Sequence, residues 1–384
     1  MIPRTAHDTL MRMARGFPVV AVTGPRQSGK TTLARATFPD KSYLSLEDPD
    51  VRLLAESDPR GLLSRFPDGV ILDEAQRSPE LFSYIQTSVD TAVRPGKYVL
   101  TGSQQFGLVS GITQSLAGRV CMVQLLPFSL GELQAEGRLP ADLDELMFRG
   151  LYPPLYDRDI TPGDWCAGYV NTYVERDVRQ LSRITDLVAF RTLAQLAALR
   201  TGQVLVTSTL ARDAKLNAVT AGRYLDLLEA SFLIRRLPPF LKNRSSRLVK
   251  SPKLHFTDSG LAAHMAGITT LEPGRDDLLR GALFETYMAQ NLAGLLEAHL
   301  PEAQMGYWHE QGRHEVDFVI EINRNVFAIE VKAATRWNEA DLSGLLAFME
   351  RTPACVAAVL AYNGKEAVKL DERLFAIPLG KLLE

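Results

Sequence analysis

The stretch FPVVAVTGPRQSGKTTLARATF, residues 17–38, decides the fold of the N-terminal part of the chain. Its first part, which ends at Gly24, is a short run of β-branched and other apolar residues and predicts a buried strand. GPRQSGKT follows at 24–31, and TLARATF then has helical spacing. A strand, a glycine-rich loop G-x-x-x-x-G-K-T and a helix in this order predict an α/β domain with a phosphate-binding loop.

The loop predicts the contacts of a nucleoside triphosphate. Its glycines let backbone N–H groups turn inward toward phosphate oxygens. Lys30 should reach the β- and γ-phosphates, and the hydroxyl of Thr31 should bind Mg²⁺. We expect ATP with Mg²⁺ as the ligand, held by Gly24, Pro25, Arg26, Gln27, Ser28, Gly29, Lys30, Thr31 and Thr32.

A second predicted strand, VILDEAQ at 70–76, ends in two acidic residues. The carboxyl ends of buried strands are where α/β sheets bind ligands. Asp73 should hold Mg²⁺, directly or through water, and Glu74 should orient or deprotonate the water that attacks the phosphate. These two carboxylates and Lys30 are therefore predicted catalytic residues.

A third strand, YVLTGSQQ at 98–105, ends in polar residues. We expect this strand to lie next to the strand that precedes the phosphate loop. Ser103, or with less preference Thr101, would then face the γ-phosphate or the attacking water. Further along, Arg119 has two open interpretations: an arginine finger for a neighbouring subunit, or a structural salt bridge.

Composition sets limits on the whole chain. It has 384 residues, 23% of them charged, and a net charge of −2, which fits an ordinary folded protein of two or three domains. Three scattered cysteines exclude a disulfide framework. The sequence has neither an apolar run long enough for a membrane span nor the apolar core of a signal peptide, so we expect a cytoplasmic protein with no membrane partner.

The motifs GPRQSGKTTLAR, VILDEAQ, YVLTGSQQF and SLAGR, in this order, resemble the AAA+-type ATPase module of a large bacterial and archaeal family. Its typical C-terminal partner is a domain of unknown function with a nuclease-like fold. The resemblance extends to FRGLYPPLY, FTDSGLAAHMAGI and GALFETYMAQNL. It implies an α/β fold with an ATPase domain, which we place at 1–135, a helical lid at 136–189 and a nuclease-like domain at 258–384. Between the lid and the nuclease-like domain we expect a winged helix-turn-helix at 190–257. The resemblance also implies a ring-type homo-oligomer, which we expect to be a hexamer.

Residues 190–257 carry a net charge of +9, and their pattern predicts a winged helix. Two amphipathic helices joined by a tight turn are followed by two short strands with a basic loop between them. Such a surface suits the phosphate backbone of DNA or RNA, and DNA is the partner we expect. The alternative is packing within an oligomer. The predicted contact residues are Arg223, Arg235, Arg236, Lys242, Arg244, Arg247, Lys250 and Lys253.

The C-terminal segment has acidic residues in the order of a metal-dependent nuclease. A predicted helix carries Glu285, and three predicted strands follow, with Asp317 on the second and Glu330 and Lys332 on the third. Residues two apart on a strand point to one face, and a short hairpin joins Asp317 to Glu330. The pattern resembles the PD-(D/E)XK nuclease superfamily.

This resemblance implies a catalytic site for Mg²⁺ or Mn²⁺. Glu285, Asp317 and Glu330 would bind the metal, and Lys332 would position the attacking water or stabilise the charge of the transition state. We therefore expect an ATPase that remodels or processes nucleic acid and carries a metal-dependent deoxyribonuclease domain. The alternative is a nucleotide-switched binding or assembly protein whose nuclease fold is catalytically inactive.

Overall fold

The computed structural model describes residues 2–91, 93–103, 115–140, 142–174, 186–241, 243, 247, 250–271, 277–310 and 313–384. The chain forms two compact units. The first is the chain up to Phe128 with two short pieces, Ala230–Phe232 and Glu297–His299, and the second holds the other residues from Ser129 onward.

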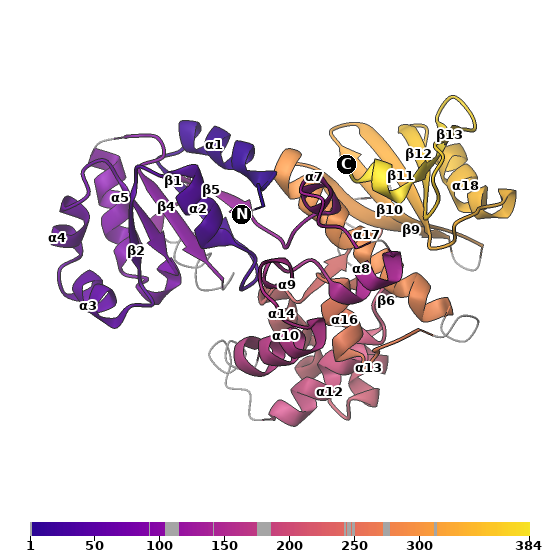
Figure 1. The fold of residues 1–384 in the computed structure, drawn as a ribbon, viewed down its shortest axis with the longest axis horizontal. Helices are drawn as coiled ribbons and strands as arrows, with labels where there is room; N and C mark the ends of the chain where they lie inside the picture. Colours follow the sequence, from indigo (N-terminus) through magenta and orange to yellow (C-terminus); the bar gives the residue numbers. More distant parts are fainter. Residues whose placement is uncertain are drawn as a thin grey trace. The chain divides into compact units, whose positions relative to one another are not determined.

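The first unit is built on a five-stranded sheet with the order β2-β3-β4-β1-β5 (Figure 1). All neighbouring strands in it are parallel. The strands are β1 (Val19–Thr23), β2 (Ser42–Ser45), β3 (Val70–Asp73), β4 (Tyr98–Gly102) and β5 (Val120–Gln124). The prediction that the strand at 98–102 lies next to the strand before the phosphate loop is confirmed, because β4 pairs with β1 along its whole length.

Helices cover both faces of this sheet, which is why β1, β3 and β4 are buried on both sides. On β1, Val19 and Ala21 pack into the larger core, and Val20 and Val22 into another. The helical segments are α1 (Ala6–Gly16), α2 (Lys30–Thr37), α3 (Pro49–Ser57), α4 (Pro59–Ser64), the 3-10 helix η1 (Ala75–Arg77) and α5 (Leu81–Thr91).

The second unit begins with short helices, and all but the first of them lie in the segment 136–189 that was predicted to be helical. They are α7 (Leu130–Ala135), α8 (Leu143–Arg149), α9 (Pro154–Asp157), α10 (Pro162–Tyr169) and the π-helix η2 (Val170–Val174). Helix α8 packs against α16 (Ser259–Met265). The carboxylate of Asp258 accepts hydrogen bonds from the backbone N–H groups of Leu151 (2.7 Å) and Leu261 (2.9 Å), so one side chain caps α16 and holds the turn after α8.

The basic segment contains the predicted helix pair and two strands, together with a third strand that was not predicted. The elements are α12 (Leu187–Ala198), β6 (Gln203–Val204), α13 (Thr207–Asp213), α14 (Ala218–Ala230), β7 (Ile234–Leu237) and β8 (Lys253–Phe256). β8 is the central strand of this antiparallel sheet, between β6 and β7.

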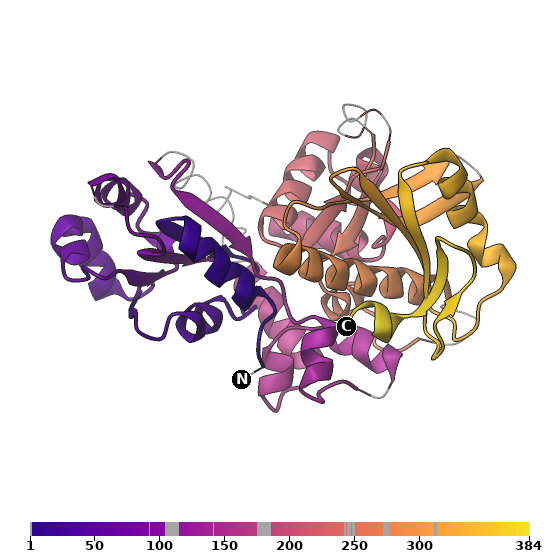
Figure 2. The same cartoon turned by 90° about the horizontal axis from the view of Figure 1, so that it is seen from above.

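The C-terminal segment forms a six-stranded mixed sheet with the order β13-β14-β12-β11-β10-β9. The long helix α17 lies alongside its strands (Figure 2). The two predicted strands around residues 311–313 and the third strand after them are confirmed. The elements are α17 (Asp277–His299), β9 (Gln304–Glu310), β10 (His314–Ile322), β11 (Asn325–Lys332), η3 (Glu339–Leu342), α18 (Ser343–Arg351), β12 (Cys355–Tyr362), β13 (Val368–Lys369), β14 (Leu374–Pro378) and α19 (Leu379–Leu382).

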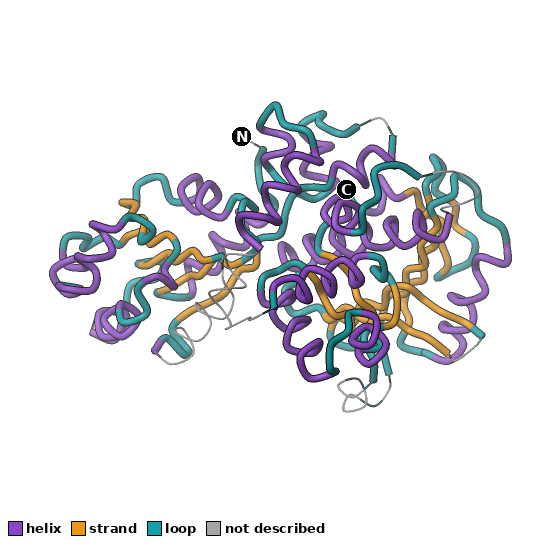
Figure 3. Tube along the Cα trace, turned by 90° about the horizontal axis from the view of Figure 1, so that it is seen from below, coloured by secondary structure: helices purple, strands orange, loops and turns teal. Residues whose placement is uncertain are grey.

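Helices and strands alternate along much of the first unit, whereas the second unit begins with a run of helices (Figure 3). No helix in the described ranges combines the length and the apolar character needed to cross a bilayer.

Candidate functional site

The phosphate loop runs between β1 and α2, and its glycines are required by geometry. Gly24 has φ +143, and a Cβ there would lie 2.1 Å from the carbonyl oxygen of Leu125. Gly29 has φ +93 and immediately precedes the first residue of α2. A side chain at either position would be strained or would collide with backbone. The loop therefore delivers the N-terminus of α2, with its partial positive charge, to the edge of the sheet.

Two loop side chains lie as the sequence predicts for a nucleotide site. Lys30 is buried, and its ammonium donates to the carbonyl oxygens of Gly24 (3.0 Å) and Pro25 (2.7 Å). The hydroxyl of Thr31 donates to Oδ1 of Asp73 at 2.8 Å. The loop and the end of β3 are thus in direct contact.

The remaining loop residues differ in their environment. Arg26 is nearly buried, with a guanidinium nitrogen 3.8 Å from Glu47. Gln27 has a positive φ of 61°, and Ser28 is fully buried. Thr32 lies exposed on the first turn of α2.

Asp73 receives two further hydrogen bonds that the sequence analysis did not predict. Tyr43 on β2 donates to Oδ2 at 2.8 Å, and Thr101 on β4 donates to Oδ1. Burial, followed by the contact with Asp73, raises the pKa of Tyr43 to about 12, so this hydroxyl keeps its proton. The parallel order β2-β3-β4 could have indicated both residues, because the ends of neighbouring parallel strands meet at one edge.

Glu74 has a left-handed backbone conformation, with φ 53° and ψ 47°. Such a conformation is costly for a residue with a side chain and is concentrated at functional sites. Its carboxylate accepts hydrogen bonds from Ser103 (2.9 Å) and from Gln76, and its N–H donates to the hydroxyl of Thr101 at 3.3 Å. Ser103 therefore holds the acid predicted to orient the attacking water.

The donors at this edge fit Mg²⁺. The hydroxyl of Thr31 and the carboxylate of Asp73 are hard oxygen ligands within hydrogen-bond distance of each other, and Mg²⁺ in phosphate sites binds through few protein oxygens and keeps several waters. The residues present are therefore suited to a magnesium–nucleotide complex.

Arg119 and Arg149 both make ion pairs within the chain. Arg119 donates to Asp90 through Nε and through Nη2, the latter at 2.9 Å. Arg149 pairs with Glu145 at 3.3 Å.

The predicted nucleic-acid residues fall into different environments. Arg223 and Lys250 are exposed and Arg235 is half-buried, whereas Lys242 and Arg244 lie outside the described residues. Arg236 pairs with Asp226 (2.8 Å) and Glu229, and Arg247 pairs with Glu321 at 2.6 Å.

Among these residues, Lys253 has the environment that differs most from the exposed one predicted for it. Its side chain is 3% exposed, and its ammonium donates to Glu285 (2.7 Å), Asp317 (3.2 Å) and Glu315. The prediction that Arg236, Arg247 and Lys253 face a phosphate backbone therefore does not fit the structure, because carboxylates of the same chain already neutralise them.

The structure brings the four C-terminal site residues into one acidic cluster. Glu285 comes from α17, Asp317 from β10, and Glu330 and Lys332 from β11. Lys332 lies 3.3 Å from Glu330, and the N–H of Val331 donates to Oδ2 of Asp317 at 2.9 Å. We define the acidic cluster as Glu285, Glu315, Asp317 and Glu330 with the two lysines Lys253 and Lys332.

Burial dominates the electrostatics of this cluster. It raises the pKa of Glu285 and of Glu330 well above the ordinary value, and the nearby Asp317 raises each further. Burial alone would lower the pKa of Lys253, but the carboxylates of Asp317, Glu285 and Glu315 outweigh it and the net shift is upward. His255, two residues along β8, has its pKa lowered to about 3 by burial and by Lys253, so its ring is neutral. Lys253 is therefore the cation that faces Glu285 and Asp317.

The acidic cluster as it stands does not fit a divalent metal. The ammonium of Lys253 donates to two of the three predicted ligands, so a metal ion would have to displace a buried positive charge. Among the residues that the structure describes, no group of three or more acidic, histidine or cysteine side chains is arranged to hold a metal ion.

The sequence analysis did not predict that Glu315 and Lys253 belong to the acidic cluster, for different reasons. Glu315 stands two residues before Asp317 on one strand and so shares its face, a signal that the alternation of side chains provides. Lys253 alternates with apolar residues on a strand that is buried on both faces. The sequence does not show which element covers each of those faces.

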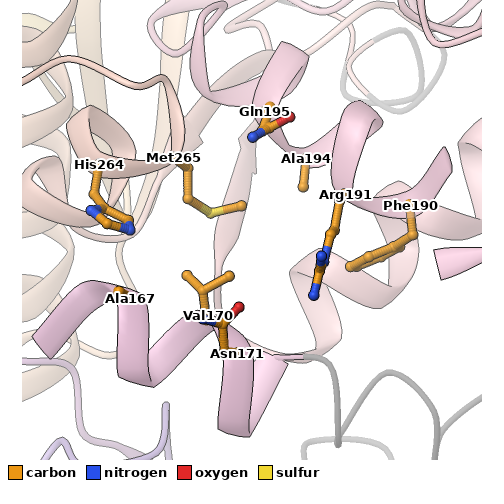
Figure 4. Close-up of a pocket in the computed structure, with 9 residues that line it drawn as sticks. All are labelled: Ala167, Val170, Asn171, Phe190, Arg191, Ala194, Gln195, His264 and Met265. Atoms are coloured by element: carbon orange, nitrogen blue, oxygen red, sulfur yellow. The ribbon is translucent and has the colours of Figure 1, made fainter. Parts of the chain in front are cut away.

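A pocket of about 230 Å³ lies elsewhere in the second unit, among α10, η2, α12 and α16 (Figure 4). No residue of the predicted sites lines it. Its walls are Ala167, Val170, Asn171, Phe190, Arg191, Ala194, Gln195, His264 and Met265.

Comparisons with family models divide the chain into three parts. An AAA domain matches residues 16–134, and two domains of unknown function, DUF8612 and DUF4143, match residues 140–272 and 280–382. Among solved structures, a Walker-type ATPase of Pyrococcus abyssi is similar at 15% identity, with a TM-score of 0.47, over 69% of this chain and 96% of that chain. The Holliday junction branch migration motor RuvB of Thermotoga maritima is similar at 15% identity, with a TM-score of 0.33, over 61% of this chain and 89% of that chain.

Two curated relatives span nearly the whole chain. They are the uncharacterized proteins Rv2008c of Mycobacterium tuberculosis and Mb2031c of Mycobacterium bovis. Each is 31% identical over 385 residues, which is 99% of this chain and 84% of the relative. The chain therefore belongs to the family of these two mycobacterial proteins, and its first unit is an AAA+-type ATPase domain.

Proposed function

We propose that the first unit hydrolyses ATP with Mg²⁺ and that the second unit couples this hydrolysis to work on nucleic acid. One observation carries the ATPase part: Thr31 of the phosphate loop and Thr101 of β4 both donate to Oδ1 of Asp73, while Ser103 holds Glu74. Three chain segments, the phosphate loop and the ends of β3 and β4, thereby meet at the carboxyl edge of one parallel sheet. This is where open α/β sheets bind their ligands.

The chain's own residues have distinct tasks in this reaction. Lys30 leaves the carbonyl oxygens of the loop and donates to the β- and γ-phosphates. Thr31 and Asp73 would hold Mg²⁺, which when bound would neutralise charge on the phosphate oxygens. Glu74 orients or deprotonates the attacking water, and the hydroxyl of Ser103 fixes the direction of its carboxylate.

Two substitutions test these tasks. Lys30→Ala should abolish ATP binding, because the loop loses the cation that contacts the phosphates. Glu74→Gln should bind ATP normally and hydrolyse it at least about 100-fold more slowly, the lower end of what a general base contributes. Binding is measured with a fluorescent ATP analogue and turnover by phosphate release.

Glu80→Gln is the matched control, since Glu80 is an exposed acid of the same domain. It should leave both quantities unchanged. Unchanged turnover in Glu74→Gln would remove Glu74 from the reaction.

For the second unit we propose a winged helix followed by a nuclease-like domain. The arrangement α12–β6–α13–α14–β7–β8, with β8 central in its sheet, supports the first. A helix, three antiparallel strands, a second helix and a parallel strand, from α17 to β12, support the second. The exposed Arg223 and Lys250 remain suited to a phosphate backbone.

Assembly and location complete the proposal. We propose a ring-type homo-oligomer, a hexamer, in which Arg119 exchanges Asp90 for the nucleotide of a neighbouring subunit. The three cysteines are free thiols, which supports a reducing compartment such as the cytoplasm.

The second candidate function is a nucleotide-switched binding or assembly protein with an inactive nuclease fold. The position of Lys253 inside the acidic cluster favours it over an active deoxyribonuclease. Cleavage of linear, nicked and four-way DNA with Mg²⁺ or Mn²⁺ separates the two functions.

A further inference from the structure

The three protons of the Lys253 ammonium match the three carboxylates around it. Nζ lies 2.7 Å from Glu285 and 3.2 Å from Asp317, and it also donates to Glu315. A lysine ammonium has three donors and no acceptor, so its hydrogen-bonding capacity is fully used. The three acids come from α17 and β10, and the lysine comes from the basic segment.

The position of Lys253 is fixed by the strand that carries it. β8 is bonded on both sides, and Lys253 itself pairs with Leu237 of β7 and Val204 of β6. The hydroxyl of Tyr307 on β9 donates to the carbonyl oxygen of Ser251 at 2.7 Å, and the ring of Tyr307 lies 5.9 Å from Nζ. The sheet fixes the backbone of Lys253, and the side chain is buried, so moving the ammonium away would leave the buried carboxylates without this cation. The three ion pairs therefore keep Lys253 in the acidic cluster.

Lys332 neutralises the other side of the cluster. Its Nζ lies 3.3 Å from Glu330 and 3.8 Å from Asp341. Each acid of the metal-nuclease pattern thus has a lysine of the same chain nearby. Buried carboxylates need a cation or a proton, and two lysines of the chain lie within ion-pair distance of these acids.

We propose that Lys253 is the built-in counter-cation of the acidic cluster, where it takes the place that a divalent metal has in a nuclease, so the cluster binds no metal. The inference rests on the proposed nuclease-like fold and deepens it. The C-terminal domain is then a binding module that does not cleave, and Lys253 joins it to the basic segment.

Metal binding tests this assignment directly. All proteins carry Asp73→Asn, which removes the predicted metal ligand of the first unit, and Mn²⁺ alone is titrated without nucleotide. Calorimetry or the electron paramagnetic resonance signal of free Mn²⁺ gives the stoichiometry. We expect no site in the Asp73→Asn protein and one Mn²⁺ per chain after Lys253→Met, because the acids then lack their cation.

Two further variants define the site. Adding Asp317→Asn to Lys253→Met should remove the gained Mn²⁺. Lys250→Met removes an exposed lysine three residues earlier and should gain nothing.

Two results would overturn the proposal. One is a Mn²⁺ site in the Asp73→Asn protein that Asp317→Asn removes, and this comparison decides the matter even if Lys253→Met does not fold. The other is a folded Lys253→Met protein that gains no site. Failure of the proposed ATPase function is distinguishable, because phosphate release by the otherwise wild-type protein is measured separately and does not depend on the Mn²⁺ titration.

Discussion

Asp258 combines full burial with several hydrogen bonds to backbone. Burial raises the pKa of its carboxyl to about 6, and the N–H groups of Leu151, Leu261 and Gly260 only partly offset this. Gly150 is constrained by the same side chain, since a Cβ there would lie 2.3 Å from Oδ1 of Asp258 and its φ is +73. FRGLYPPLY and FTDSGLAAHMAGI therefore meet at one structural residue.

The raised pKa of Asp258 predicts a pH effect on stability. The folded protein holds the carboxyl proton of Asp258 more tightly than the unfolded chain does. The contribution of Asp258 to the free energy of unfolding is therefore complete below about pH 4. It is lost as pH rises toward 6, by about 3 kcal/mol for a shift of this size. The free energy of unfolding of Asp258→Asn, measured with urea from pH 4 to 7, should therefore rise relative to wild type by about this amount.

Asparagine is uncharged throughout this pH range. Any change in free energy of unfolding that Asp258→Asn causes by altering the cap of α16 is therefore the same at every pH. A difference between the two proteins that does not change with pH would show that Asp258 keeps an ordinary pKa.

At the scale of elements, the basic segment divides its charges between two uses. Arg236 and Arg247 are bound to acids of the chain, whereas Arg223 on α14 and Lys250 just before β8 are exposed. The net charge of +9 therefore overstates the number of cations available to a polyanion. Ion pairs formed after folding are invisible in a charge sum over consecutive residues.

The exposed pair predicts the salt dependence of DNA binding. Each phosphate contact adds about −0.9 to the slope of log affinity against log salt concentration. Arg223→Ala and Lys250→Ala should each make the slope shallower by about this amount, as measured by fluorescence anisotropy between 50 and 200 mM salt.

Lys365→Ala changes an exposed lysine outside the basic segment and should leave the slope unchanged. If Arg223→Ala and Lys250→Ala also leave the slope unchanged, the basic segment packs within an oligomer and does not bind DNA.

At the scale of the whole molecule, much of the ATPase site was predictable from sequence. The phosphate loop and the Asp73–Glu74 pair are consecutive motifs whose geometry follows from a strand, a loop and a helix. The contacts of Tyr43 and Thr101 with Asp73 need the order of strands, which no single motif contains. The C-terminal acids were predictable as a group because one helix and one hairpin carry them. Lys253 was not, since it reaches them from another sheet.

Assembly is the prediction that belongs to this scale. With a non-hydrolysable ATP analogue, light scattering at micromolar concentration should give the mass of a hexamer. Arg119→Ala should still bind ATP but hydrolyse it more slowly, since the neighbouring subunit loses its arginine.

The protein without nucleotide is the reference for the mass. A monomer under all nucleotide conditions would contradict the ring and leave Arg119 with its structural partner Asp90.

The occupancy of a site by a cation of the same chain does not depend on concentration in solution, as the occupancy by a dissolved ion does. The occupancy of a metal site follows the free concentration of the metal, and a chelator empties it. Lys253 is tethered, so its local concentration at Glu285 and Asp317 is set by the fold and is independent of the medium. Fluctuations in cellular magnesium or manganese then reach the ATPase unit alone, while the junction between the basic segment and the C-terminal domain does not respond to them.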